Sequence, residues 1–330
     1  MGHSEWDPGL ASLCQASRQF NQLATRHLYH TIYEYVFESK WWLLARTLIA
    51  RRDLAGLVKR LELTDPDRTE LVPHSGFLPP EVTTYYASQF ALAANAGPTA
   101  GPAAGDLTSP DTKGKSFPAI ASLLASLCPN LETLQCLGYS DTVAYTFCPP
   151  ASLPALQRLV VRLDVLLRDD CEKFELDAVF SLFWAAPNIK SLDLNRFTDL
   201  YNGCVQVPDG LRLENVTYLG ADFCDMSTDT LINLFLLCPN LQHLDGSSGL
   251  SGIRPQNVVH AVLAHAPSLT ELSFEFNLEC WRQGWGSGPE EEFPEYDLQE
   301  TKQLLDASGR QIRYRFTDDN YYVWNILLES

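Results

Sequence analysis

Apolar residues recur along the chain in a short pattern that is written six times. The pattern places them at the first, fourth and sixth positions of a six-residue stretch, commonly just after Pro-Asn. Residues 128–136 and 238–245 are the closest copies, and looser ones lie at 153–161, 186–194, 214–219 and 266–274. The first apolar residues stand at positions 131, 156, 189, 216, 241 and 269, so the successive spacings are 25, 33, 27, 25 and 28 residues. Such self-similarity predicts a repeat architecture.

Each repeat predicts one strand and one helix. After the Pro-Asn corner, apolar and polar residues alternate, which indicates a strand with one buried side. Residues 177–185, 228–237 and 256–265 precede such corners and carry apolar residues at helical spacing. Proline cannot continue a helix, so we expect it to end the helix and begin the strand. The strand residues expected to point inward are Leu134, Cys136, Leu159, Val161, Leu192, Leu194, Leu219, Ala221, Leu244, Gly246, Leu272 and Phe274.

Stacking of these units predicts the fold class. One strand–helix unit cannot bury its own apolar side, whereas stacked units can. Units of about 20–29 residues with this pattern are typical of leucine-rich repeats. We therefore predict an α/β leucine-rich-repeat solenoid with parallel strands on its concave side and helices on its convex side. The expected parts are a helical cap at 1–30, the solenoid at 31–278 with a disordered insertion at about 95–116, and a linker and cap at 279–330.

The acidic composition narrows the class of partner. The 330 residues include 41 acidic and 24 basic ones, which gives a net charge of −17. A nucleic-acid-binding protein needs a basic surface, so that class is excluded and a basic protein partner is favoured. The sequence contains no apolar run that predicts a membrane span and no signal-peptide pattern, so we expect a cytoplasmic or nuclear protein. The nine cysteines include no C-x-x-C pair, and we expect buried, reduced thiols.

No motif for catalysis or for a cofactor is found in the sequence. The glycines at 284, 286 and 288 are followed by proline and acidic residues, which does not suit a phosphate-binding loop. The histidine pairs at 27 and 30 and at 260 and 265 lack the spacing of zinc ligands. We therefore expect an interaction protein, not an enzyme, with no cofactor and no metal.

The polar residues between the inward positions predict a binding surface. In a parallel repeat array they form columns that cross successive strands. The middle and later repeats place acidic residues around an aromatic centre, with arginines at the earlier end, and this arrangement suits a basic protein surface. The residues that we expect to bind a protein substrate are Arg158, Arg162, Asp193, Tyr218, Asp222, His243, Asp245, Glu271 and Glu275.

The N-terminal segment resembles part of a known module. Residues 13–29 carry apolar residues, with Ser17 and Arg18 between them, at the spacing of the second half of an F-box in fungal F-box/leucine-rich-repeat proteins. The following segments are similar to the same family: a short strand at 32–33, a helix at 41–51 and a first repeat strand at 54–63. The opening half of an F-box, a Leu-Pro-x-Glu segment and an apolar helix, is not part of the match.

The resemblance implies a role in ubiquitin-dependent protein degradation. A member of this family would be the substrate-recognition subunit of a cullin–RING (SCF-type) ubiquitin ligase. A Skp-type adaptor would bind the N-terminal segment, and a protein substrate would bind the concave face of a monomer. The alternative is a stand-alone leucine-rich-repeat scaffold or inhibitor with no ligase. The residues that would contact the adaptor are Leu10, Leu13, Cys14, Phe20 and Leu28.

Overall fold

Nine parallel strands form one sheet in which the strands follow one another in chain order. The computed structural model describes residues 18–35, 41–64, 81–82, 84–85, 88, 116–138, 148–163, 174–198, 206–224, 226–248, 253, 255–276 and 295–318. The strands of the sheet are β1 (Thr31–Tyr35), β2 (Arg60–Thr64), β3 (Thr133–Gly138), β4 (Arg158–Leu163), β6 (Ser191–Asn195), β8 (Tyr218–Cys224), β9 (His243–Ser248), β10 (Glu271–Phe276) and β11 (Arg313–Asp318). A second sheet pairs β5 (Phe174–Glu175) with β7 (Phe197–Thr198). Such an order arises when each strand is followed by a crossover that returns beside it.

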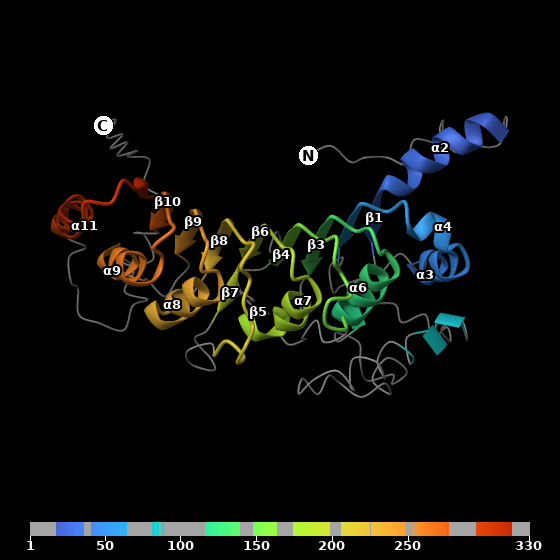
Figure 1. Ribbon diagram of the computed structural model, residues 1–330, viewed down its shortest axis with the longest axis horizontal. Coiled ribbons are helices and arrows are strands. Elements are labelled where there is room, and N and C mark those ends of the chain that lie inside the picture. The colour runs from blue at the N-terminus through green and yellow to red at the C-terminus, as the bar shows by residue number, and fades with distance from the viewer. Residues whose placement is uncertain are drawn as a thin grey trace.

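Helices lie along one side of this sheet and at its ends. They are α2 (Arg18–His30), α3 (Trp41–Ala50), α4 (Arg52–Ala55), α6 (Ser116–Leu127), the 3₁₀ helix η3 (Leu176–Val179), α7 (Phe180–Ala185), α8 (Thr228–Leu237), α9 (Pro255–His265) and α11 (Glu295–Ala307). Figure 1 shows the strands along the inner side of a shallow arc and the helices from α3 to α9 along its outer side. Helix α2 projects from the N-terminal end of the array. The α/β class and the parallel sheet predicted from the repeats are confirmed.

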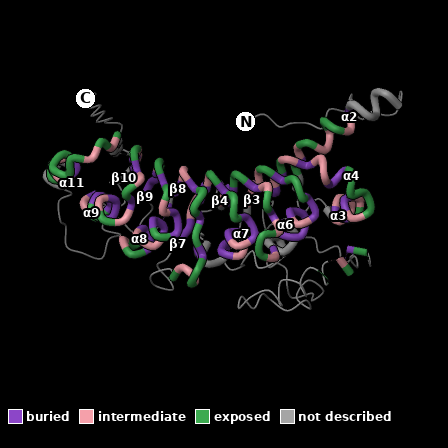
Figure 2. The backbone as a smooth tube through the Cα atoms, in the orientation of Figure 1, coloured by how far each residue is buried: buried purple, intermediate pink, exposed green. Residues whose placement is uncertain are grey.

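A continuous apolar core lies between the sheet and the helices. All twelve residues predicted to point inward are buried, and so are the six apolar residues that lead the repeats. Figure 2 shows buried residues along the whole length of the array. Gly246 is part of this core because the ring of Phe274, its register partner, lies 3.0 Å from the position that a Cβ would occupy. The prediction of the buried side of the strands is therefore confirmed.

The Pro-Asn corners are joined to one another by asparagine side chains. Asn188 donates a hydrogen bond of 2.8 Å from Nδ2 to the carbonyl of Pro154 in the preceding corner. Asn130, Asn215 and Asn240 make the same kind of bond to the carbonyls of Gly56, Pro187 and Glu214. We call this series of bonds the asparagine ladder. It explains why asparagine recurs in the sequence pattern, because a corner leaves backbone carbonyls that need a donor.

Helix boundaries follow the prediction, with one exception near the N-terminus. Helices α6, α7, α8 and α9 all end one residue before the Cys-Pro or Ala-Pro step of their corners. We predicted a strand at 54–63, but Leu54 and Ala55 belong to α4 and the strand begins only at Arg60. These two residues are buried, and together with α3 the short helix α4 fills the helical part of the unit between β1 and β2.

Candidate partner-binding face

The side of the sheet opposite the helices carries the polar residues of each strand, and we call it the strand face. The predicted columns are in register across β3 to β10, apart from one position described below. Strands β1, β2 and β11 extend the columns at both ends. The first column reads Thr31, Arg60, Thr133, Arg158, Ser191, Tyr218, His243, Glu271, Arg313, and the second reads Tyr33, Glu62, Gln135, Val160, Asp193, Gly220, Asp245, Ser273, Arg315.

A β-bulge in β8 interrupts the register between β8 and β9 at Asp222. Ala221 pairs with Gly246 and Cys224 with Ser248, so β8 carries one residue more than β9 over this stretch. Asp222 therefore does not pair with Ser247, although a spacing of 25 residues between these two repeats would align them. On its other side Asp222 still pairs with Asn195 of β6. A bulge redirects side chains and is common beside functional sites.

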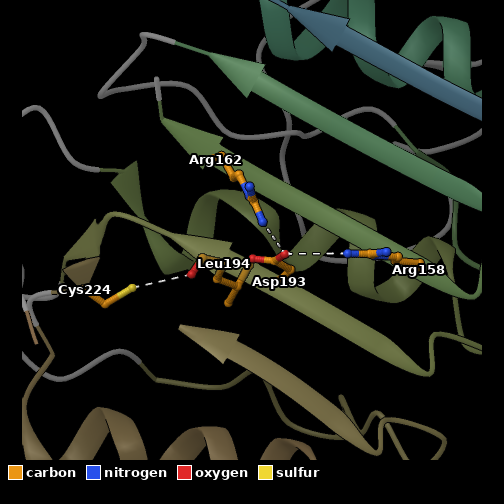
Figure 3. A network of polar contacts seen from close by, with 5 residues as sticks. All are labelled: Arg158, Arg162, Asp193, Leu194 and Cys224. Carbon is orange, nitrogen blue, oxygen red and sulfur yellow. Dashed lines mark hydrogen bonds and ion pairs between the residues drawn. The ribbon is translucent and has the colours of Figure 1, made fainter. Parts of the chain in front are cut away.

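Hydrogen bonds from Arg196 and Cys224 hold the bulge in place. The backbone N–H of Arg196 donates to the carbonyl of Asp222 at 2.8 Å. The single S–H of Cys224 is shared between that carbonyl, at 3.2 Å, and the carbonyl of Leu194, at 3.6 Å, and the second contact is drawn in Figure 3. Arg196 has a φ of 66°, which a residue with a side chain adopts uncommonly. The carboxylate of Asp222 therefore starts from a backbone position that is fixed from two strands.

Asp193 lies at the centre of a group of three charged side chains. Its Oδ2 is 2.7 Å from Nη2 of Arg162 and 4.0 Å from Nη2 of Arg158, and both arginines come from the neighbouring strand β4 (Figure 3). The Asp193 side chain is only 7% exposed, whereas those of Arg158 and Arg162 are 55% and 41% exposed. A carboxylate this deeply buried needs a cation beside it. These three residues were predicted to lie on one face, but the ion pairs between them were not predicted.

Tyr218, Asp222 and Asp245 form an acidic group beside the Asp193 cluster. Cε1 and Oη of Tyr218 lie 3.4 Å from the position of a Cβ on Gly220, so the ring leans along its own strand over this glycine. Burial raises the pKa of Tyr218, and the charges of Asp245, Asp193 and Asp222 raise it further. Within the described part of the chain, neither Asp222 nor Asp245 makes an ion pair. No cation of the described chain therefore forms an ion pair with the two carboxylates of this group.

The pKa of Asp222 is raised, in part by the neighbouring carboxylates of the same group. Burial of the half-exposed carboxyl raises its pKa, and the charges of Asp245 and Asp193 act in the same direction. The guanidinium of Arg162 lowers the pKa and only offsets part of this rise. Like charges this close disfavour the ionised form of each other, so a cation from outside would relieve the repulsion.

At the C-terminal end of the face, Glu271 contacts one histidine and one arginine. His243 Nδ1 is 3.0 Å from Oε2 of Glu271, and Arg313 of β11 forms an ion pair with Oε1. Arg313 was missed because we assigned residues 311–316 to a cap and not to the array. Arg60 and Glu62 form an ion pair at the other end, in the segment predicted as the first repeat strand, and the sequence analysis did not include them among the binding residues. Glu275 lies in β10 in register with Ser247 and Thr317, and its side chain is outside the described part.

The residues expected to contact an adaptor lie mostly outside the described range. Leu10, Leu13 and Cys14 precede the first described residue. Phe20 and Leu28 belong to α2, where Leu28 is half-buried and the Phe20 side chain is not described. The next residue, Tyr29, packs against the apolar core and joins this helix to the array.

The cysteines of the described segments are buried thiols with no disulfide. Burial raises the pKa of Cys128, Cys148 and Cys238 to about 12, which keeps these thiols protonated and unreactive. This agrees with the prediction of buried, reduced thiols. The described residues contain no group of three or more His, Cys, Asp or Glu that could hold a metal ion. None of the helices that the structure describes is long and apolar enough to cross a membrane.

No known family model matches the chain, and no curated protein sequence matches it.

Proposed function

We propose that the chain is a non-catalytic protein-interaction module, built as a leucine-rich-repeat solenoid, that binds a protein partner on its strand face. The observation that carries this proposal is the contrast between the two sides of each strand. The inward positions hold apolar residues in every repeat, whereas the outward ones change from strand to strand. Side chains that vary along a shallow concave surface are the means by which repeat proteins recognise extended partners.

The charge distribution on the strand face favours a basic partner. The acidic group of Tyr218, Asp222 and Asp245 keeps its charge, while the other predicted acids, Asp193 and Glu271, are paired with cations of the chain itself. The net charge of −17 adds a long-range attraction for a basic surface. On the strand face, Asp222 and Asp245 are thus the acids without an ion pair among the described residues, and they lie between acids that are paired with arginines.

Within this proposal, the resemblance of residues 13–29 to an F-box assigns the partner the role of a ubiquitin-ligase substrate. The chain would then act in the cytoplasm or the nucleus, with a Skp-type adaptor on its N-terminal segment and the substrate on the strand face. Figure 1 supports separate regions for the adaptor and the substrate, because α2 projects from the end of the array, away from its middle strands. A scaffold without ligase would use the same face.

The adaptor proposal is tested by a pull-down of the full chain with a purified Skp-type adaptor. We expect binding that is lost in a double variant carrying Leu13→Asp and Phe20→Asp. The matched control is Leu236→Asp, which makes the same change at an exposed leucine of α8 on the helical side. Binding that survives the double variant, or none to a folded sample, would reject the ligase role and leave the scaffold.

The face proposal is tested separately, on immobilised basic and acidic peptides of equal length. We expect retention on the basic peptides to fall when Asp222 and Asp245 are both changed to lysine. The control pair is Asp209→Lys and Asp306→Lys, two exposed acids that lie off the strand face. Equal retention on acidic peptides, or equal loss in the control pair, would show that binding does not use the face.

A further inference from the structure

Four polar side chains surround Gly220 at the centre of the strand face. Tyr218 and Asp222 lie two residues before and after it on β8, and Asp193 and Asp245 are its register partners on β6 and β9. Residues two apart on a strand share a face, and neighbouring strands lie about 4.8 Å apart. The four side chains therefore converge over a position that carries no side chain of its own. We call these four residues the Gly220 ring.

One carboxylate oxygen of this ring is buried without a partner. Asp193 pairs with Arg162 through Oδ2, whereas its Oδ1 has no hydrogen-bond partner among the described residues. This Oδ1 lies 3.4 Å from the position of a Cβ on Gly220, so it is directed into the ring. Buried carboxylate oxygens in folded proteins nearly always accept a hydrogen bond. The ring thus contains an acceptor for which the described chain supplies no donor.

The ring also holds more negative charge than the nearby cations neutralise. Arg162 and Arg158 both approach Asp193, while Asp222 and Asp245 make no ion pair within the described residues. The raised pKa of Asp222 agrees with this excess of negative charge. A cation placed among the three carboxylates would be attracted by all of them, and it would come from outside the described chain.

We infer that the Gly220 ring binds the ammonium group of one lysine side chain of a protein partner. This inference rests on the proposed function, in which the strand face binds a protein. An ammonium group is compact and carries three donors, which matches acceptors on Asp193, Asp222 and Asp245. The aromatic ring of Tyr218 adds a surface that attracts cations. A guanidinium is planar and pairs best with one carboxylate through two parallel hydrogen bonds, so it matches three carboxylates on three neighbouring strands less well.

The site is tested by NMR titration of the ¹⁵N-labelled full chain with Nα-acetyl-lysine methylamide. We expect saturable shifts of the amide signals of Gly220 and its neighbours, with a dissociation constant on the order of millimolar, as for a single exposed ion-pair site. The norleucine analogue has a similar apolar stem without the charge and should cause no such shifts. Equal shifts with norleucine, or tighter binding of the arginine analogue, would overturn the assignment to lysine.

Two variants decide whether the ring itself is responsible. Gly220→Val places methyl groups among Tyr218 and Asp193 without changing charge, and we expect it to reduce affinity at least about tenfold, because the ammonium can no longer reach Oδ1 of Asp193. Asp245→Asn changes an exposed side chain, leaves folding intact, and should weaken binding up to about fivefold. Asp209→Asn, an exposed acid outside the strand face, should change nothing.

These outcomes separate the ring from the wider proposal. Unchanged affinity in Asp245→Asn would overturn the ring, even if Gly220→Val proved too unstable to test. Retention of basic peptides by the strand face would survive that result, because the peptide experiment depends on the summed charge of the face. Conversely, the natural chain could bind the lysine analogue at the ring without retaining basic peptides. That result would reject binding of a peptide along the whole strand face but would keep the lysine site.

Discussion

The Pro-Asn corners and the strand face are built from the same repeats but follow opposite rules. At the corners, the same residue type does the same thing four times: an asparagine donates to a carbonyl of the preceding corner. On the face, the first column changes from Arg158 through Ser191 to Tyr218 over three adjacent strands. A residue type that recurs at the same position of each repeat indicates a contribution to stability that every repeat requires. A position whose residue type changes from strand to strand is what the proposed binding of one partner requires.

The asparagines of the corners and Asp193 of the face also differ in how completely their side chains are hydrogen-bonded. At the corners the asparagine side chains are bonded, and Arg310 continues the ladder where asparagine is lacking. Its Nη2 donates to Ala266, Pro267 and Leu269 carbonyls, of which Pro267 stands in the ladder position. On the face, Asp193 keeps a buried oxygen without a partner. Departures from polar satisfaction are expected where a site is kept for a ligand.

The largest effect is expected from the core beneath the face. Leu219 is fully buried on the inward side of β8, between Tyr218 and Gly220. Leu219→Ala removes three buried carbon atoms and should lower the free energy of unfolding by about 2–5 kcal/mol, measured by urea denaturation. Leu236→Ala on α8 is the matched control, because that leucine is 56% exposed and should lose about 0.5 kcal/mol or less. Equal losses would mean that the inward side of the strands is not the main source of stability.

The next effect is expected at the last corner. The guanidinium of Arg310 donates to the carbonyls of Val262, Ala266, Pro267 and Leu269, and so ties the C-terminal strand to the end of α9. Arg310→Ala should lower the free energy of unfolding by about 1.5–3 kcal/mol, the range for hydrogen bonds to a charged group. Arg310→Lys keeps the charge but cannot reach four carbonyls, so it should not restore stability. Full stability of the lysine variant in a thermal melt would contradict this role.

A smaller effect is expected from a single step of the asparagine ladder. Asn240→Ala removes the bond of 2.8 Å to the carbonyl of Glu214 and should lower the free energy of unfolding by about 0.5–1.5 kcal/mol. Ser268 occupies the equivalent place in the next corner and makes no ladder bond among the described contacts. Ser268→Ala should therefore leave the urea midpoint unchanged. A similar shift in both variants would show that the corner position, and not the bond, is responsible.

The repeat part of the fold was predictable from sequence because one local pattern fixes it. The apolar spacing of residues such as Leu241 and Leu244 gave strand positions, burial and register together, since a parallel array aligns equivalent positions. The ends of the array were harder to predict. The strand of Arg313 lies 42 residues after that of Glu271, with no clear motif between them, so its pairing with β10 could only come from the structure.

The sequence predicted which residues share the candidate site, as columns across the strands. It did not predict the hydrogen bonds and ion pairs among them. The register placed Asp193 beside Gly220, and this could be derived from the spacing of the repeats. Two features could not. The bulge at Asp222 depends on hydrogen bonds from Arg196 and Cys224, which lie in two different strands or at their ends. The pairing of Asp193 with Arg162 depends on side-chain conformations that a column does not specify.

The smallest effect is expected on the face, and it has the opposite sign. Because burial and neighbouring carboxylates raise the pKa of Asp222, the folded state holds its proton more tightly than the unfolded chain does. The ionised form therefore disfavours folding at pH 7, and Asp222→Asn should raise the free energy of unfolding by about 0.5 kcal/mol or less at this half-exposed position. The gain should shrink as the pH falls through the raised pKa and vanish below about 3.8, the ordinary value, where both states are protonated.

Urea midpoints measured from pH 4 to 8 check this sign, with Asp209→Asn as the control acid outside the face. A variant less stable than the natural chain at pH 7, or a difference that does not depend on pH, would mean that Asp222 serves the fold as the corners do. The expected result would instead separate the two regions by the sign of the change, because removing a corner group lowers stability and removing this face group raises it. A gain of stability on removal of this charge would support the proposal that Asp222 serves binding and not folding.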